Sequence, residues 1–373
     1  MEGIPRKILR CKGKTIGLGD LETYQKMIGG RKNERSLSMD QLVVTVFEMA
    51  KDIHTGISSL VRQYETNKEW GSRLKAVVQA SLSYHFTRLI ENQQTNIYLL
   101  NMPYTAETGS GRGLGSNPIT SQKFVPFKEN EITEDGNIDF ITEDGNIDFI
   151  DEQGLMGKEE KIYCLIDIVD GTWNASCGLT FSCSTMLAFT RPSVQKPTDL
   201  TLADFEYGFI IPYCGFGLYV GQLHNPTMLL SWDGLGMQLN MSPVKDVSKT
   251  RVILDLFTEE KKDSLAKSIP VIGPVIYDWC DYGRFYGAGV EIAALFGYRN
   301  LVPGFSAYVA AHQKMDNIVP SWSMILGAGG IVTDWWGDPI TTKRLSDRVH
   351  VIMSANQDLH DNLVQHLSKR PRN

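Results

Sequence analysis

The sequence predicts a protein that mixes helices and sheets, with an α+β first half and an α/β second half. Two long amphipathic helical patterns come first, and apolar strand-like stretches follow from residue 160. After Pro243, strand-like runs alternate with helical patterns, which is typical of an α/β unit. We therefore expect three parts in the 373-residue chain, namely an N-terminal arm at 1–37, an α+β domain at 38–243 and an α/β domain at 244–373.

Two helices are expected before residue 100. Ser38 and Gln41 form a capping-box pattern, and apolar residues then recur every three or four positions to about Tyr64. The second helix spans about 72–91, where six apolar residues share one face: Leu74, Val77, Val78, Leu82, Phe86 and Leu89.

The strands are expected where short apolar, β-branched and aromatic runs are bounded by turn residues. In the first half they form a largely antiparallel sheet, with strands at 162–169, 180–190, 207–213 and 217–223. In the second half, strands are expected at 252–257, 274–277, 305–309, 331–335 and 350–355. Helices fit between and after them, at about 259–268, 288–297, 318–327 and 358–368.

Composition argues against several classes of protein. There are 37 Lys and Arg against 43 Asp and Glu, and no basic domain compensates the net charge of −6, so nucleic acid is not an expected partner. No run of about 18 apolar residues occurs, so we expect no membrane span. The basic N-terminus is not followed by the apolar segment of a secretory signal. The six cysteines form no CxxC pair, which favours a reducing, cytoplasmic location.

The nonapeptide ITEDGNIDF occurs twice in tandem, at 132–140 and 141–149. Each copy contains Asp-Gly, a hairpin signal, so we interpret the repeat as a duplication in a surface hairpin. The alternative, an acidic calcium-binding loop, lacks the ligand spacing that such loops need.

A candidate metal site lies at the end of the first predicted strand. There Asp167 and Asp170 stand three residues apart, and the carbonyl of Ile168 could supply a third oxygen. Oxygen ligands of this kind suit Mg²⁺ or Ca²⁺. Gly171 allows the backbone to approach a ligand closely, and Thr172 adds a hydroxyl and an N–H group. The alternative is an ordinary Asp-Gly turn capped by threonine, because turns favour the same residues.

Two further segments could bring acidic side chains to the same place. Asp151 and Glu152 follow an apolar stretch and begin sixteen residues before Asp167, and Asp316 precedes a predicted helix far downstream. Acids from three segments would repel one another unless a cation neutralises them. We therefore expect a divalent cation where these acids meet.

Three motifs occur in order along the chain: Asp151-Glu152-Gln153-Gly154, Asp167-Ile168-Val169-Asp170-Gly171-Thr172 and Ala328-Gly329-Gly330-Ile331-Val332-Thr333-Asp334. Together they resemble the motifs of the inositol-monophosphatase superfamily of Mg²⁺-dependent, lithium-sensitive phosphatases. The resemblance covers about residues 40–368, apart from an insertion at about 100–147. It implies a layered αβαβα sandwich like that of the fructose-1,6-bisphosphatases, a homodimer, and hydrolysis of a small phosphate monoester.

The resemblance also implies roles for individual residues. Thr172, with the acidic pair Asp151 and Glu152, would orient the attacking water. The N–H groups of Gly171 and Thr172 would bind the phosphate of the substrate. Two or three Mg²⁺ ions would be held by Asp167, the carbonyl of Ile168, Asp170 and Asp316, with Asp151 or Glu152 completing the set.

The substrate stays open between several phosphate monoesters. No acid occurs from 300 to 315, where inositol-specific members carry one, which weighs against inositol phosphate. The stretch 327–337 resembles the histidinol-phosphatase branch, as the stretch around Asp281 does faintly, so Asp281 is a candidate substrate-binding residue. Arg284 could contact an anionic substrate or form a surface salt bridge. Sugar and nucleotide phosphates remain further candidates.

The chain departs from the family pattern in several places. Ile168 replaces a proline, Asp151 replaces a glutamate and Met315 replaces a tryptophan. The family spacing before the glycine-rich motif falls on Asn317 rather than Asp316; either residue could fill the third-aspartate position, and we favour Asp316. These changes support a second hypothesis, a degenerate member that keeps the fold and acts as a binding or scaffold protein.

Overall fold

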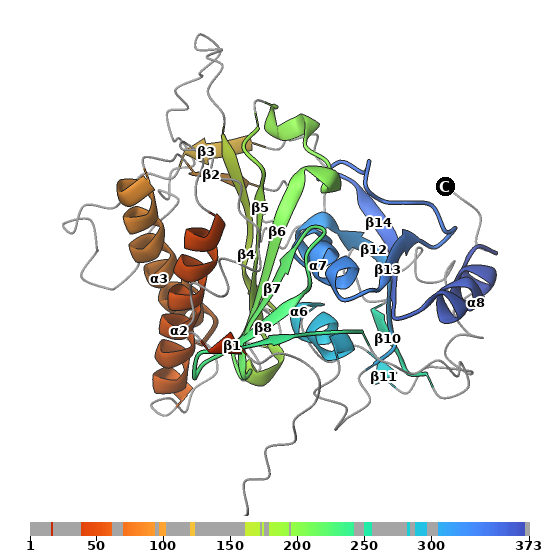
Figure 1. Ribbon diagram of the computed structural model, residues 1–373, viewed down its shortest axis with the longest axis horizontal. Helices are drawn as coiled ribbons and strands as arrows, with labels where there is room; N and C mark the ends of the chain where they lie inside the picture. Colours follow the sequence, from red (N-terminus) through yellow and green to blue (C-terminus); the bar gives the residue numbers. More distant parts are fainter. Residues whose placement is uncertain are drawn as a thin grey trace, which may run out of the picture.

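The protein consists of alternating layers of helices and sheets (Figure 1). The computed structural model describes residues 16–17, 39–61, 70–93, 97–101, 120–123, 161–171, 174, 179–193, 195–241, 250–255, 282–283, 288–296 and 305–369. In order, the layers are α2 (Met39–Val61) with α3 (Trp70–Gln93), a nine-stranded sheet, α6 (Ala288–Ala293) with α7 (Met315–Gly327), a five-stranded sheet, and α8 (Gln357–Leu367). This order confirms the αβαβα sandwich that the family resemblance implies.

The nine-stranded sheet has the order β1-β9-β8-β7-β6-β5-β4-β2-β3. Its neighbouring strands are antiparallel except for β2 and β4, which are parallel. The strands are β1 (Ile16–Gly17), β2 (Ile97–Asn101), β3 (Thr120–Lys123), β4 (Ile162–Asp170), β5 (Ser184–Thr190), β6 (Phe205–Pro212), β7 (Gly217–Gln222), β8 (Met228–Ser231) and β9 (Leu235–Gln238).

One expected strand of this sheet is shorter than predicted. The run expected at 180–190 begins with a 3-10 turn at Thr180–Ser182, and β5 starts only at Ser184. The Ser182 N–H and hydroxyl both donate to the Leu179 carbonyl, at 3.0 and 2.7 Å, and these two bonds close the turn. The remaining predicted strands of the first half are confirmed, with ends that differ by one or two residues.

The five-stranded sheet has the order β11-β10-β12-β14-β13. β10 is parallel to both of its neighbours, whereas β14 is antiparallel to β12 and β13. The strands are β10 (Val252–Asp255), β11 (Tyr282–Gly283), β12 (Ala307–Lys314), β13 (Ile331–Asp334) and β14 (Arg348–Ser354). The strand expected at 274–277, the helix expected at 259–268 and the tandem nonapeptide lie outside the described residues.

β12 runs five residues beyond its predicted end, so α7 begins at Met315 and not at residue 318. The polar run His312-Gln313-Lys314 breaks the apolar pattern that predicts a strand. The pairing with β14 nevertheless continues past a register shift between Ala310 and Gln313, where His312 adopts a positive φ of 52°.

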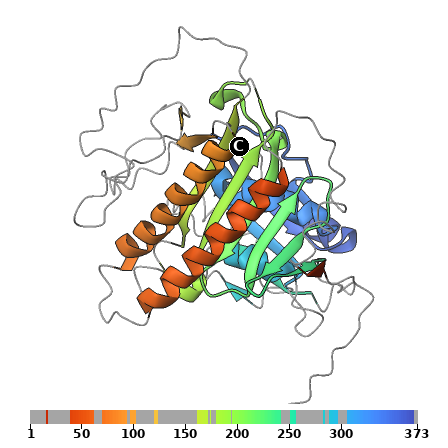
Figure 2. The same ribbon diagram turned by 60° about the vertical axis from the view of Figure 1, so that its left-hand side comes forward.

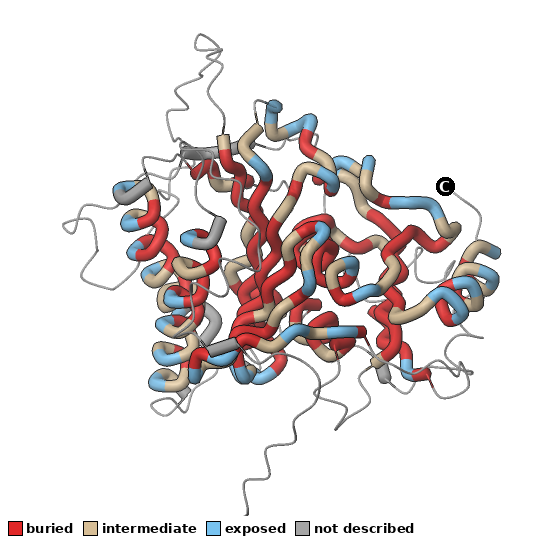
Figure 3. Tube along the Cα trace, in the orientation of Figure 1, coloured by how far each residue is buried: buried red, intermediate tan, exposed pale blue. Residues whose placement is uncertain are grey.

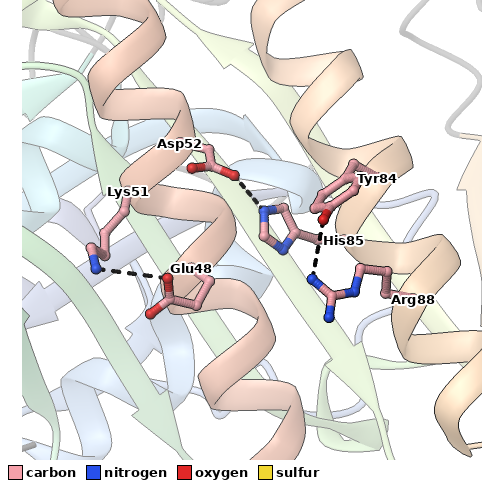
Figure 4. A network of polar contacts seen from close by, with 6 residues as sticks. All are labelled: Glu48, Lys51, Asp52, Tyr84, His85 and Arg88. Atoms are coloured by element: carbon pink, nitrogen blue, oxygen red, sulfur yellow. Dashed lines mark hydrogen bonds and ion pairs between the residues drawn. The ribbon is translucent and has the colours of Figure 1, made fainter.

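Helices α2 and α3 cover one face of the nine-stranded sheet, as the view in Figure 2 shows. Five residues of the predicted apolar stripe of α2 are buried against that face, and Leu60 is partly buried there. On the polar side of the helix pair, His85 Nε2 lies 2.7 Å from Asp52 Oδ2, and Arg88 donates to the Tyr84 hydroxyl at 3.1 Å (Figure 4). The first contact joins the two helices and is partly buried, and the second lies within α3 and is exposed, so each contributes about 1 kcal/mol at most.

The middle helix α7 comes from the second half of the chain but packs on β6 and β7 of the first sheet. Two glycines on these strands make room for it. A Cβ atom at Gly208 would lie 1.7 Å from the Pro320 carbonyl oxygen, and one at Gly221 would lie 2.5 Å from the Met324 nitrogen. The continuous buried interior that results runs between the two sheets (Figure 3).

The predicted domain boundary near 244 falls within residues 242–249, which are outside the described part of the chain. Every described strand of the first sheet precedes it and every described strand of the second follows it. None of the helices that the structure describes is both long enough and apolar enough to cross a lipid bilayer.

Candidate metal-binding site

The C-terminal end of β4 carries the two aspartates of the predicted metal site. In a regular strand, residues three apart point to opposite faces. Here β4 has one extra residue relative to β5, because Asp167 pairs with Met186 whereas Asp170 pairs with Ser184. This bulge resets the alternation, so both carboxylates face the middle helical layer while Val169 packs toward α2 and α3.

Asp170 is held by two hydrogen bonds from neighbouring elements. Its Oδ2 accepts from the backbone N–H of Gly289 in α6 at 2.7 Å and from the Ser184 hydroxyl on β5 at 3.1 Å. The side chain of Asp170 is only 3% exposed. A Cβ atom at position 289 would lie 2.4 Å from Ser184 Oγ, so α6 reaches the carboxylate this closely because residue 289 is glycine.

The carbonyl of Ile168 already accepts two hydrogen bonds. Thr185 Oγ1 donates to it at 2.8 Å and the Tyr213 hydroxyl at 2.9 Å. Burial raises the pKa of Tyr213 well above its ordinary value, and the negative charges of the nearby aspartates add to this, so the hydroxyl keeps its proton. A carbonyl has two lone pairs, so one of these donors has to move before Ile168 can bind a metal. Its role as a ligand remains a prediction.

Asp316 reaches the same region from the first turn of α7. It is 5% exposed, and its Oδ1 accepts from the backbone N–H of Asn317 at 3.0 Å. The side chain of Asn317 instead donates from Nδ2 to Gln313 Oε1 at 3.0 Å. Asp316 and Asn317 could each fill the third-aspartate position. Of the two, Asp316 is the one that carries a carboxylate, and its negative charge raises the pKa of Asp167 on β4.

The three carboxylates disfavour one another's ionisation. Burial raises the pKa of Asp167 well above its ordinary value, and the negative charges of Asp170 and Asp316 raise it further. Burial likewise raises the pKa of Asp316. The Lys314 ammonium opposes both shifts, because its positive charge favours the ionised carboxylates. Buried acids of this kind carry protons or need a further cation.

This donor set fits a hard divalent cation, since it consists of carboxylate oxygens with unfavourable mutual repulsion. Within the described part of the chain, no three Asp, Glu, His or Cys side chains lie close enough to form a metal-binding group on their own. The five other residues that the sequence assigns to the site all lie outside the described residues: Asp151, Glu152, Thr172, Asp281 and Arg284.

The structure adds residues to this site that the sequence does not indicate. Ser184 and Gly289 bind Asp170, Gln313 contacts the start of α7, and Lys314 places a positive charge beside the acids. Of these four residues, only Lys314 could have been suspected from its position in the sequence, because it is a basic residue two positions before Asp316. The other three act through contacts between distant segments.

Comparison with known proteins identifies the fold. No family model matches the chain, and no curated protein matches its sequence. Solved structures do match. The extragenic suppressor protein SuhB from Bartonella henselae has a TM-score of 0.51 at 12% identity, over 89% of this chain and 100% of that one.

Two inositol monophosphatases give similar values. Inositol monophosphatase-II from Staphylococcus aureus has a TM-score of 0.52 at 13% identity, over 88% of this chain and 96% of that one. The inositol monophosphatase from Anabaena has a TM-score of 0.50 at 14% identity, over 88% and 97%. The chain therefore has the fold of the inositol monophosphatases, as its three ordered motifs predict.

Proposed function

We propose that this protein is a phosphatase of the inositol-monophosphatase superfamily that hydrolyses a small phosphate monoester with Mg²⁺. The proposal is supported by the fold and by the charges of Asp170 and Asp316, which lie near enough to Asp167 on β4 to raise its pKa. We also propose that the protein is a soluble homodimer in the cytoplasm, and this part of the proposal rests on the sequence and its family resemblance alone.

The three aspartates would hold the ions, with Asp151 or Glu152 completing the set. Bound Mg²⁺ supplies positive charge for the phosphate and lowers the pKa of a water molecule. The chain itself fixes the geometry of the ligands. Gly289 and Ser184 orient the carboxylate of Asp170 through the two hydrogen bonds to its Oδ2.

The chain leaves the metal site through Gly171, whose φ of +86° few other residues adopt without strain. This turn would direct the N–H groups of Gly171 and Thr172 toward the phosphate of the substrate. Thr172, together with Asp151 and Glu152, would orient the attacking water. These assignments rest on the motif in the sequence.

The substrate is proposed by class. The structural neighbour from S. aureus has been solved with inositol monophosphate and with 2′-AMP, so this fold accommodates both a polyol phosphate and a nucleotide. In this chain, the motif at 327–337 favours histidinol phosphate, and the absence of an acid from 300 to 315 weighs against inositol phosphate.

The test is phosphate release from a panel of histidinol phosphate, inositol phosphate and adenosine bisphosphate, with and without Mg²⁺. We expect release from at least one of them that needs Mg²⁺ and that Asp167→Asn abolishes. Absence of release on the whole panel, together with no rise in Tm on adding Mg²⁺, would support the degenerate binding protein instead.

A further inference from the structure

A buried chain of polar side chains runs from the end of β10 to the start of α7. At its inner end, Asp255 is fully buried, and the Tyr308 hydroxyl donates to its Oδ2 at 2.7 Å. The side-chain amide of Gln313, itself 1% exposed, donates to the same Oδ2 and to the Tyr308 oxygen, the latter at 2.9 Å. Both hydrogens of this amide are therefore used.

At its outer end the chain reaches the metal site. Gln313 Oε1 accepts from the backbone N–H of Lys314 at 3.2 Å and from Asn317 Nδ2 at 3.0 Å. The backbone N–H of Asn317 then donates to Asp316 Oδ1. The N-cap residue of α7 is Lys314, which makes no side-chain capping bond, so Gln313 anchors this helix start from the strand side.

The direction of every donor follows from the buried acid. Asp255 Oδ2 accepts hydrogen bonds from both the Tyr308 hydroxyl and the Gln313 side chain, so Gln313 turns its NH₂ group toward Asp255. Its oxygen then faces α7, and Asn317 must present its NH₂ group in return. Reversing either amide would set two oxygens against each other in a buried place, where neither could find a donor.

We propose that Gln313 is a positioning residue that holds Asp316 at the metal site, and that Asn317 belongs to this network and does not bind metal. The inference deepens the proposed function, because it requires that Asp316 binds a divalent cation. It also accounts for an asparagine at the position on which the family spacing falls, since only a donor can satisfy Gln313 Oε1 there.

The substitution Asn317→Asp distinguishes a metal ligand from a member of the hydrogen-bond network, because the two roles predict opposite changes in metal affinity. If Asn317 were a metal ligand, a carboxylate would bind Mg²⁺ or Mn²⁺ more tightly. In the network, the carboxylate faces Gln313 Oε1 without a hydrogen to donate, so the start of α7 shifts. We expect the affinity for Mn²⁺, measured by isothermal titration calorimetry on the full chain, to fall by about 10- to 100-fold, the usual effect of losing a residue that orients a ligand.

Gln313→Leu should lower the Mn²⁺ affinity in the same way. The matched control is Ser354→Ala on the neighbouring strand β14, which loses a buried hydrogen bond to His360 of 3.0 Å that does not lead to the site. This control should lower the Tm and leave the affinity unchanged. Asn317 is only partly buried, so its variant keeps the test usable if Gln313→Leu does not fold.

Asp316→Asn distinguishes failure of the inference from failure of the proposed function. If Asp316→Asn bound Mn²⁺ as tightly as the wild type, Asp316 would not be a metal ligand. The role that the proposed function gives to this carboxylate would then be wrong. Weakened binding in Asp316→Asn, combined with wild-type or tighter binding in Asn317→Asp, would overturn the positioning role alone.

Discussion

The contact between α6 and Asp170 can be tested with a single methyl group. In Gly289→Ala, the new Cβ would lie 2.4 Å from Ser184 Oγ and 3.0 Å from Met186 Sδ, so α6 or β5 has to move. The movement stretches the 2.7 Å bond from the residue 289 N–H to Asp170. Overpacking of this kind costs about 1–3 kcal/mol, and a hydrogen bond to a charged group is worth about 1.5–3 kcal/mol.

The two costs arise from one displacement and do not add in full. We therefore expect the free energy of unfolding to fall by about 2–3 kcal/mol, which corresponds to a fall in Tm of about 3–5 °C for a chain of this size. Metal affinity should fall as well, because Asp170 loses the donor that orients it. Urea unfolding and isothermal titration calorimetry with Mn²⁺ measure the two effects separately.

Ser184→Ala supplies the internal control. It removes the atom with which the new Cβ collides, so Gly289→Ala should cost less stability in this background than in the wild type. An equal cost in both backgrounds would refute the collision. If Gly289→Ala in the wild-type background kept the stability and the Mn²⁺ affinity of the wild type, α6 would not need a glycine to reach Asp170.

Three further outcomes are expected. Asp167→Asn should raise the Tm of the metal-free protein while abolishing Mg²⁺-dependent turnover, because it removes a buried charge from a repulsive set; a lower Tm would contradict the repulsion. Burial lowers the pKa of His360, so the unfolded state binds a proton first and stability should fall as the pH drops below about 6.5; His360→Gln should flatten this dependence in urea titrations from pH 8 to 5. Gly208→Ala should cost about 3 kcal/mol or more in urea unfolding, since its Cβ meets the Pro320 carbonyl of α7, and a near-neutral result would contradict the packing.

Much of the architecture follows from local patterns in the sequence. The helices α2 and α3 repeat apolar residues with helical spacing, and most residues of the predicted stripes are buried, while Leu60 and Val77 are partly buried. The two aspartates at the end of β4 follow a continuous apolar strand, and the structure places them at a strand end beside α7. Signals of this kind lie within ten or twenty residues, so they are visible without the fold.

The remaining features depend on contacts between distant segments. The bulge that turns Asp170 to the side of Asp167 exists only in the pairing of β4 with β5. The hydrogen bond from Gly289 to Asp170 spans 119 positions, and the one from Gln313 to Asp255 spans 58. The continuation of β12 to Lys314 is likewise decided by its neighbour β14, although the polar residues there argue against a strand. No local pattern encodes such partners.

The position of α7 ties the two halves of the polypeptide to one another. A fragment that stops at residue 243 would leave the face of β6 and β7 that packs on α7 open to water, and a fragment that starts at residue 244 would expose the apolar side of α7. Neither piece could bury the core that lies between the two sheets, to which both halves contribute, so the halves should melt in a single transition. Truncation products should then aggregate rather than behave as independent modules.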